Sequence, residues 1–186
     1  MSVTKADGAQ LARGIGPRPI ASNRFAVQLE ALFVQHERQI GNYLLQMVRD
    51  RELAEDLLQD VFHQALRDSA GLANARSPSA WLFGIARNKA LAALRRRRRF
   101  WRAHQRLVRR GSDQSANDQE LIAVYELLER SLAPDDRALV LLRYLHGFSA
   151  VELAGMTGRT PAAIRQRLAR ARTSLLVSEQ PDLEGP

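Results

Sequence analysis

Apolar side chains recur every three or four residues along most of this 186-residue chain. Segments with this spacing cover residues 25–47, 52–65, 78–94, 121–132, 137–145 and 149–175. One face of an α-helix repeats at this interval, whereas a strand with one buried face alternates apolar and polar residues. No stretch of the sequence sustains that alternation. The pattern therefore predicts an all-α fold.

Polar stretches between these segments indicate how the helices are grouped. Residues 111–118 carry no large apolar side chain and are predicted to be the core of a flexible linker between two small helical domains, at 25–110 and 119–178. Residues 1–24 are predicted to form a flexible leader. Inside the first domain, residues 68–77 hold glycine, asparagine and serine, which predicts a loop. Residues 179–186 form an acidic tail.

The net charge of +8 conceals a block pattern. Residues 69–112 carry twelve basic and no acidic side chains, and residues 137–178 carry seven basic and one acidic. Acidic blocks precede them, with net charges of −3 at 37–68 and −6 at 113–136. This alternation indicates two separate surfaces that face polyanions such as nucleic acid. A membrane surface is a poorer partner, because neither basic block has a broad apolar face.

Several classes of protein find little support in the composition. The chain has no cysteine, which excludes disulfides, thiolate zinc sites and a cysteine nucleophile. Its four histidines are not spaced as metal ligands. No phosphate-binding loop or nucleophile motif occurs, so neither a cofactor nor an enzyme activity is expected. No apolar run is long enough to span a membrane, and a cytoplasmic protein is expected.

The strongest local pattern is a helix-turn-helix near the C-terminus. Ser149 and Glu152 have the spacing of a capping box, Gly158 occupies a short turn, and Thr160 and Pro161 begin a second helix. Its predicted buried stripe is Ile164, Leu168, Ala171 and Leu175. The remaining faces carry arginine, glutamine and alanine, which suit a helix that contacts base edges in the major groove. A helical hairpin with a solvated basic face is the alternative.

A basic helix and an acidic helix lie in the first domain. Ser77 and Pro78 are predicted to begin the basic helix, which ends in five arginines at 95–99. An isolated arginine run is typical of a solvated surface, but upstream aromatic and amide side chains suit single-stranded DNA. Trp81 taken alone is typical of a core residue. The acidic residues at 55–60 form either a solvated helix face or a docking surface for a basic protein.

Five segments, in this order, resemble the extracytoplasmic-function sigma factors of bacterial RNA polymerase. They are residues 54–62, 80–88, 132–134, 141–149 and 163–172, and the similarity covers about 25–176. The resemblance implies a non-catalytic promoter-specificity subunit. Such a subunit binds core RNA polymerase, recognises the minus-thirty-five and minus-ten promoter elements and promotes strand opening.

The resemblance also implies roles for particular residues. The helix that docks on the β′ clamp helices of polymerase would use Glu55, Asp56, Gln59, Asp60 and Phe62. The loop that captures a flipped-out base and the minus-ten helix that follows it would use Asn74, Arg76, Trp81, Arg87, Asn88, Lys89, Arg95 and Arg96. The minus-thirty-five reader would use Arg159, Thr160, Arg165, Gln166, Ala169 and Arg170.

Family membership would bring further partners. These are the β flap of polymerase, duplex and melted promoter DNA, and a cognate anti-sigma factor that could hold the chain at the membrane when it is not with polymerase on the nucleoid. Two positions depart from the family pattern. Ala92 replaces a frequent aspartate, and Gly84 replaces a long polar or basic residue, at up to ~1 kcal/mol of helix stability relative to alanine.

Two other functions compete with this one. The chain could be an ordinary helix-turn-helix regulator that binds a palindromic duplex site as a dimer. It could also be a basic helical protein that binds RNA or another polyanion without promoter preference.

Overall fold

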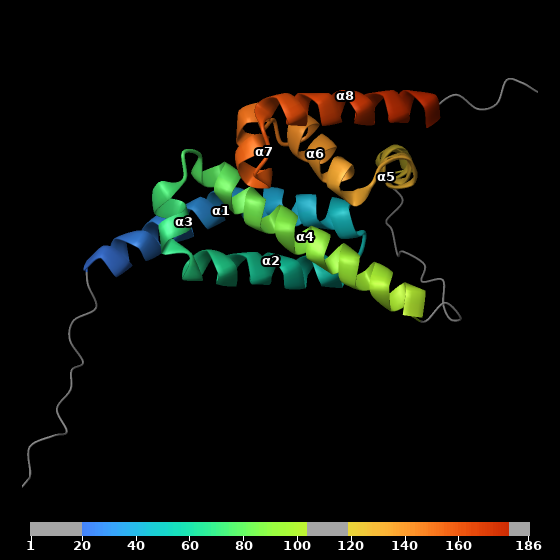
Figure 1. The fold of residues 1–186 in the computed structure, drawn as a ribbon. Helices are drawn as coiled ribbons and strands as arrows, with labels where there is room; N and C mark the ends of the chain where they lie inside the picture. The colour runs from blue at the N-terminus through green and yellow to red at the C-terminus, as the bar shows by residue number, and fades with distance from the viewer. Residues whose placement is uncertain (1–19, 104–118, 179–186) are drawn as a thin grey trace, which may run out of the picture.

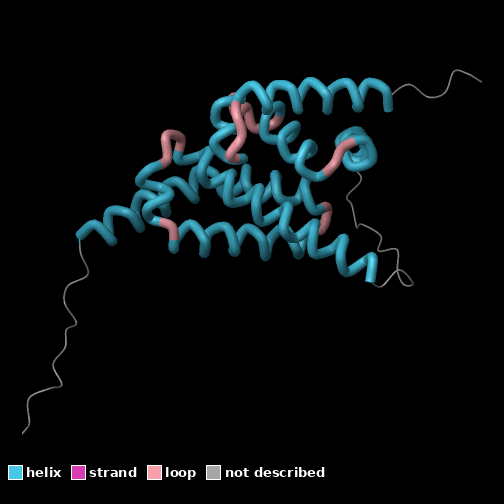
Figure 2. The backbone as a smooth tube through the Cα atoms, viewed as in Figure 1, coloured by secondary structure: helices cyan, strands magenta, loops and turns pink. Residues whose placement is uncertain are grey.

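The computed structural model describes residues 20–103 and 119–178, with side chains described for 24–100 and 123–178. This part of the chain contains eight helices and no strand (Figures 1 and 2), which confirms the all-α prediction. Residues 1–19 of the predicted leader, the linker core at 111–118 and the acidic tail at 179–186 lie outside the described residues.

The N-terminal unit consists of α1 (Ile20–Val48), α2 (Arg51–Arg67), α3 (Ser69–Asn74) and α4 (Pro78–Ala103). The α1 helix begins earlier than the predicted start near Phe25, so residues 20–24 do not belong to a flexible leader. Once a helix is nucleated, each added residue gains a hydrogen bond, so a helix can extend beyond its apolar stretch.

The prediction of a loop over residues 68–77 is wrong in its first part, because α3 lies there. The Asp68 carboxylate accepts a hydrogen bond from the Gly71 backbone N–H at 2.8 Å and caps the helix. Leu72 is buried and anchors it to the core. After α3, Ser77 Oγ accepts from the Ala80 N–H at 3.3 Å, so Ser77 begins α4 as the sequence predicts.

The C-terminal unit consists of α5 (Gln119–Ser131), α6 (Pro134–Tyr144), α7 (Ala150–Thr157) and α8 (Pro161–Ser178). The α6 helix starts at Pro134 rather than at Arg137, because proline is suited to the first helical position. The predicted capping box at the start of α7 is present, and Gly158 ends that helix with φ of +65°. The left-handed backbone at Gly158 explains why glycine stands in the turn.

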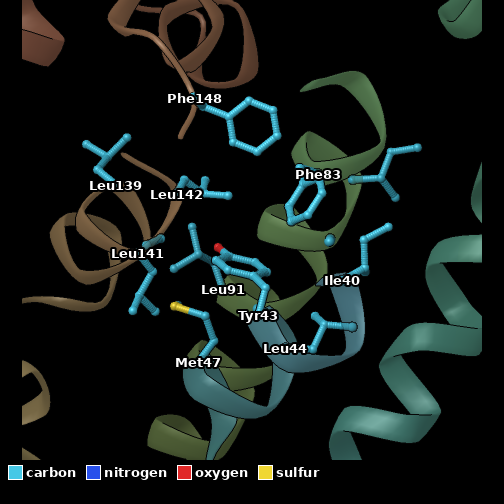
Figure 3. Packing of buried hydrophobic residues seen from close by; sticks show 14 of the residues in the cluster. Ile40, Tyr43, Leu44, Met47, Phe83, Leu91, Leu139, Leu141, Leu142 and Phe148 are labelled. Atoms are coloured by element: carbon cyan, nitrogen blue, oxygen red, sulfur yellow. The ribbon is translucent and has the colours of Figure 1, made fainter. Parts of the chain in front are cut away.

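The two units pack against each other. Helices α6 and α7 lie on one side of α1 and α4, and α2 lies on the other side (Figure 1). In Figure 3, Tyr43 of α1, Phe83 of α4, and Leu142 and Phe148 of the C-terminal unit point toward one another. All four side chains are buried. The sequence patterns predicted two helical domains but did not predict this contact between them.

Candidate polymerase and nucleic-acid interfaces

The outer face of α2 carries the residues predicted to bind polymerase. Glu55, Asp56, Gln59 and Asp60 are exposed, while Phe62 is half-buried with its ring 4.6 Å from that of Phe33. Asp60 accepts a hydrogen bond from Lys89 Nζ at 3.1 Å. An exposed pair of this kind contributes at most about 1 kcal/mol and holds neither partner firmly. The acidic face is therefore accessible to another protein.

A groove runs beside this face, between α1 and α2. It contains two hollows of about 340 and 420 Å³ that share Glu37, Glu55 and Leu58 as lining residues. Apolar side chains and the two shared glutamates line part of both hollows, and Arg38 and Arg51 also line the smaller one. The larger hollow, lined by Phe33, Leu58 and Phe62 as well as the two glutamates, thus offers an apolar and acidic surface to a helix that carries apolar and basic side chains.

The residues predicted to contact the minus-ten element extend from the end of α3 along α4. Most are exposed, namely Asn74, Arg76, Asn88, Arg95 and Arg96. Lys89 is half-buried and paired with Asp60, as described above. Trp81 is half-buried, and its indole nitrogen lies so close to Gly71 that a Cβ there would collide with it.

Arg87 differs from the other predicted minus-ten residues, because its side chain is only 9% exposed. Its Nη2 donates a 2.7 Å hydrogen bond to Asp135 Oδ1 of α6, and its Nη1 donates to Asn88 Oδ1 at 3.3 Å. The Asp135 carboxylate of the C-terminal unit therefore pairs with the Arg87 guanidinium. The structure does not bring Arg87 to the exposed surface that holds Arg95 and Arg96.

The residues predicted to contact the minus-thirty-five element gather on α8 and the turn before it. Arg159, Thr160, Arg165, Gln166, Ala169 and Arg170 are all exposed. Ile164, Leu168 and Ala171 are buried as predicted, and Leu175 is half-buried. Arg167 is engaged inside the unit, where Nε donates to Asp136 Oδ1 at 2.7 Å and Nη2 forms an ion pair with the same oxygen at 2.7 Å. The exposed face thus combines small side chains with hydrogen-bond donors.

The surface between the two units was not predicted, and its polar residues include Arg137. This residue is 3% exposed and its Nη2 donates to the Met47 carbonyl oxygen of α1 at 2.9 Å. The His146 ring lies between Tyr43 and Phe83, with centroid distances of 5.7 and 5.0 Å. Burial lowers the pKa of His146 and raises the pKa of Tyr43. The arginine within an apolar run was the one local signal of this surface.

Glu152 takes part in both the capping box and the contact between units. The Ser149 backbone N–H donates to Glu152 Oε2 at 2.9 Å and holds the pKa of that carboxyl below its ordinary value. Hydrogen bonds from the Ser149 and Ser77 hydroxyls act in the same direction, while burial opposes them. The Ser77 hydroxyl donates to Oε1 at 3.1 Å from the start of α4. Glu152 therefore stays ionised while it joins α7 to α4.

Within residues 20–103 and 119–178, no group of three or more histidine, aspartate or glutamate side chains is placed to hold a metal ion. In the same residues, no helix is both long enough and apolar enough to cross a bilayer.

Comparison with known proteins identifies the family. Residues 32–100 match Sigma-70 region 2, and residues 122–175 match Sigma-70, region 4. The ECF RNA polymerase sigma factor SigM of Mycobacterium tuberculosis is 32% identical over 156 residues, which cover 84% of this chain and 78% of SigM. The chain is an extracytoplasmic-function sigma factor. It is thus a promoter-recognising sigma subunit of RNA polymerase, and not a dimeric regulator or a general polyanion-binding protein.

Other relatives agree with this assignment. The RNA polymerase sigma factor CarQ of Myxococcus xanthus is 32% identical to this sigma factor over 144 residues, or 76% of this chain and 83% of CarQ. Two solved structures share the fold at 23% identity and a TM-score of 0.63. One is the sigma factor RpoE from Bartonella quintana with the anti-sigma factor NepR, covering 86% of this chain and 99% of RpoE. The other is CnrH with the cytosolic domain of CnrY, covering 87% and 97%.

Proposed function

We propose that this sigma factor binds core RNA polymerase through α2 and contacts the promoter through α4 and α8, and that it catalyses no reaction itself. The observation that carries the proposal is the separation of three exposed surfaces with different chemistry. An acidic face lies on α2, a basic face on the second half of α4, and a face rich in donors on α8. Each one contains residues that the family pattern assigns to polymerase, the minus-ten element or the minus-thirty-five element.

The acidic face of α2 and the groove beside it fit the β′ clamp helices. Glu55, Asp56, Gln59 and Asp60 would pair with basic side chains of the clamp, and Phe62 with Leu58 would supply apolar contact. Charge complementarity of this kind raises the association rate and fixes the register of the complex. The C-terminal unit would then meet the β flap.

The exposed residues of α3 and α4 fit the melted minus-ten strand. Arg95 and Arg96 would follow its phosphates, while Asn74, Arg76 and Trp81 would hold a flipped-out base. Extruding a base costs a few kcal/mol, so a stacking surface and a cationic path are needed to offset that cost. Asn88, Lys89 and Arg87 would join this surface.

The exposed face of α8 fits the major groove of the minus-thirty-five element. Arg165 and Gln166 would donate to base edges, Ala169 would allow close approach, and Arg159, Thr160 and Arg170 would contact the backbone. The structurally similar sigma factor RpoE was solved with the anti-sigma factor NepR. By analogy, a cognate anti-sigma factor would keep this sigma factor from binding polymerase, either in the cytoplasm or at the membrane. After release, the sigma factor would bind promoters on the nucleoid as part of the holoenzyme.

In vitro transcription with core polymerase and a promoter library tests this function. A reproducible start site should require the chain. Asp60→Arg should abolish transcription, since it reverses a charge on the docking face, and Glu30→Arg is the matched control on an exposed part of α1. Arg165→Ala should weaken promoters that depend on the upstream element, whereas Arg130→Ala on α5 should not. Unchanged transcription with both Asp60→Arg and Arg165→Ala would contradict the assigned surfaces.

A further inference from the structure

One arginine of α8 faces the interior of region 4 instead of solvent. Arg167 lies on the same side of the helix as Ile164, three positions earlier, and Ala171, four positions later, and both of these residues are buried. The Arg167 side chain is 24% exposed, whereas Arg165 and Arg170 belong to the exposed face. The helical phase thus places Arg167 outside the surface that carries the predicted minus-thirty-five residues.

The partner of Arg167 is a carboxylate of α6. Arg167 Nε donates a hydrogen bond to Asp136 Oδ1 at 2.7 Å, and Nη2 lies 2.7 Å from the same oxygen. Asp136 belongs to the first turn of α6, where the helix dipole favours a negative charge. The α6 helix is itself held firmly, because residues 137–142 are all buried. The ion pair therefore connects α8 to a fixed part of region 4.

The apolar contacts of α8 leave its rotation about the helix axis weakly determined. The buried residues of this helix are one isoleucine, one leucine and one alanine, at positions 164, 168 and 171. Burial of apolar area is not directional, so a small rotation changes its free energy little. A charge-assisted hydrogen bond is directional, and a guanidinium that presents two nitrogens to one oxygen restricts the geometry further.

Small rotations of α8 matter for contacts with base edges. A helix with its side chains has a radius of about 5–6 Å, so a rotation of about 10° moves the tip of a side chain by about 1 Å. The distances of N–H···O hydrogen bonds cover only about 0.5 Å. Arg165, Gln166 and Ala169 lie within two positions of Arg167 on the same helix, so they share any rotation of it.

We propose that Arg167 and Asp136 are positioning residues for minus-thirty-five recognition, and that their ion pair sets the rotation of α8 while neither residue contacts DNA. The inference rests on the proposed function in one respect, the assignment of the exposed face of α8 to the minus-thirty-five element. The pair determines how strictly Arg165 and Gln166 discriminate between bases.

Promoter binding by the holoenzyme measures this discrimination. Core polymerase reconstituted with the full chain is titrated into two fluorescent promoter duplexes. One duplex carries the minus-thirty-five element of a promoter selected from the library, and the other carries a scrambled sequence at the same place. The ratio of the two affinities is the discrimination ratio, and each variant is compared with the unaltered chain at the same salt concentration.

Asp136→Ala separates a positioning role from a direct contact. If Arg167 contacted DNA, loss of Asp136 would free its guanidinium, and the less acidic chain would bind both duplexes more tightly, with an unchanged or higher ratio. A positioning role predicts the opposite, a roughly tenfold lower ratio. Glu126→Ala on α5 is the matched control, because it removes another carboxylate of region 4, one that is 56% exposed, and should leave the ratio unchanged.

An exchange of the two charges tests the pair itself. Asp136→Arg and Arg167→Asp each place two like charges together, and each should lower the ratio at least as much as Asp136→Ala does. The double variant restores an opposite pair and should recover most of the ratio, whereas Arg167→Lys keeps the charge without the planar fork and should fall between. A double variant no better than either single variant would overturn the positioning role.

Circular dichroism melts of the full chain keep a loss of folding apart from a loss of discrimination. All affinities are measured well below the melting temperature of each variant. Where a reversed charge prevents folding, Asp136→Asn takes its place, because it removes the charge and keeps the size of the side chain. An unchanged ratio in Asp136→Asn would then overturn the positioning role.

Arg165→Ala in the same assay separates this inference from the proposed function. If the unaltered chain does not prefer the selected element, or if Arg165→Ala leaves the preference intact, the assignment of α8 is wrong and the positioning role falls with it. If Arg165→Ala removes the preference while Asp136→Ala leaves it unchanged, the proposed function stands and the positioning role is overturned.

Discussion

Truncation of one ring should uncouple the two regions of this sigma factor. Phe83 of α4 is 1% exposed and contacts aromatic rings from both sides. Its centroid is 6.0 Å from that of Tyr43 in region 2, and 5.0 Å from those of His146 and Phe148 in region 4. Phe83→Ala therefore removes core packing from region 2 and two ring contacts that cross the interface.

The loss of core packing and the loss of ring contacts across the interface differ in their cost in free energy. Loss of a buried phenylalanine side chain costs about 3–5 kcal/mol of stability in total. An aromatic pair contributes about 0.5–1.5 kcal/mol beyond its buried area, so the two pairs across the interface account for about 1–3 kcal/mol of coupling. A coupling of that size corresponds to a roughly 5- to 150-fold change in the ratio of coupled to uncoupled molecules.

Urea unfolding followed by two probes measures both quantities. Both tryptophans, Trp81 and Trp101, belong to α4, so fluorescence follows region 2, whereas far-ultraviolet circular dichroism follows the helices of both regions. The two transitions should coincide in the unaltered chain. In Phe83→Ala the midpoint of the fluorescence transition should move to a lower urea concentration. The midpoint of the dichroism transition should then lie at a higher urea concentration than the fluorescence midpoint.

A buried residue on the far side of region 2 provides the control. Val61 of α2 is fully buried, and α2 lies on the opposite side of α1 and α4 from α6 and α7 (Figure 1). Val61→Ala should cost about 2 kcal/mol and shift both transitions together. Coincident transitions in Phe83→Ala would refute the reasoning, because they would show that the ring contacts do not couple the regions.

Three further predictions concern local structure and pH. Gly71→Ala should lower the melting temperature and disrupt the junction of α3 with α4, because a Cβ would collide with the Asp68 carboxylate; thermal melts measure this change. Ser149→Ala should lower the free energy of unfolding by about 1 kcal/mol through loss of the capping box, and urea titration measures that loss. Because burial lowers the pKa of His146, the unfolded chain binds a proton more readily, so stability is complete above the ordinary histidine pKa and declines as pH falls below it. Urea midpoints between about pH 8 and pH 5.5 should show this decline, His146→Gln should flatten it, and His63→Gln should not.

Local signals predicted the helices well. Ser77 with Pro78, and the Ser149 to Glu152 capping box, identify helix starts because the capping atoms are neighbours in sequence. The apolar period predicted the buried side of α8 for the same reason. The short α3 was missed, since six residues give too little periodicity, and its cap at Asp68 resembles that of a turn.

The contact between regions could not be predicted in this way. Arg137 bonds to a carbonyl ninety positions earlier in the chain, and Arg87 bonds to an aspartate forty-eight positions later. No local pattern encodes such pairs. Helical phase correctly suggested which basic side chains of α8 would be exposed, but it gave no warning that Arg87 would be buried. Gly84 and Arg137 were visible in the sequence as exceptions, and only the packing explains them, since a Cβ at Gly84 would contact Met156 of α7.

The C-terminal end of α1 is stabilised by a hydrogen bond from region 4, so its stability reports whether region 4 is in contact with region 2. This helix has no basic residue in its last turn, and two arginines from elsewhere bond to its final carbonyls. Arg97 of α4 donates to Val48 at 3.3 Å, and Arg137 of region 4 donates to Met47 at 2.9 Å. When region 4 departs, Met47 loses its donor and that turn of α1 frays more readily. Amide hydrogen exchange at this turn should therefore quicken under any condition that separates region 4 from region 2, and Arg137→Ala should quicken it in the free chain.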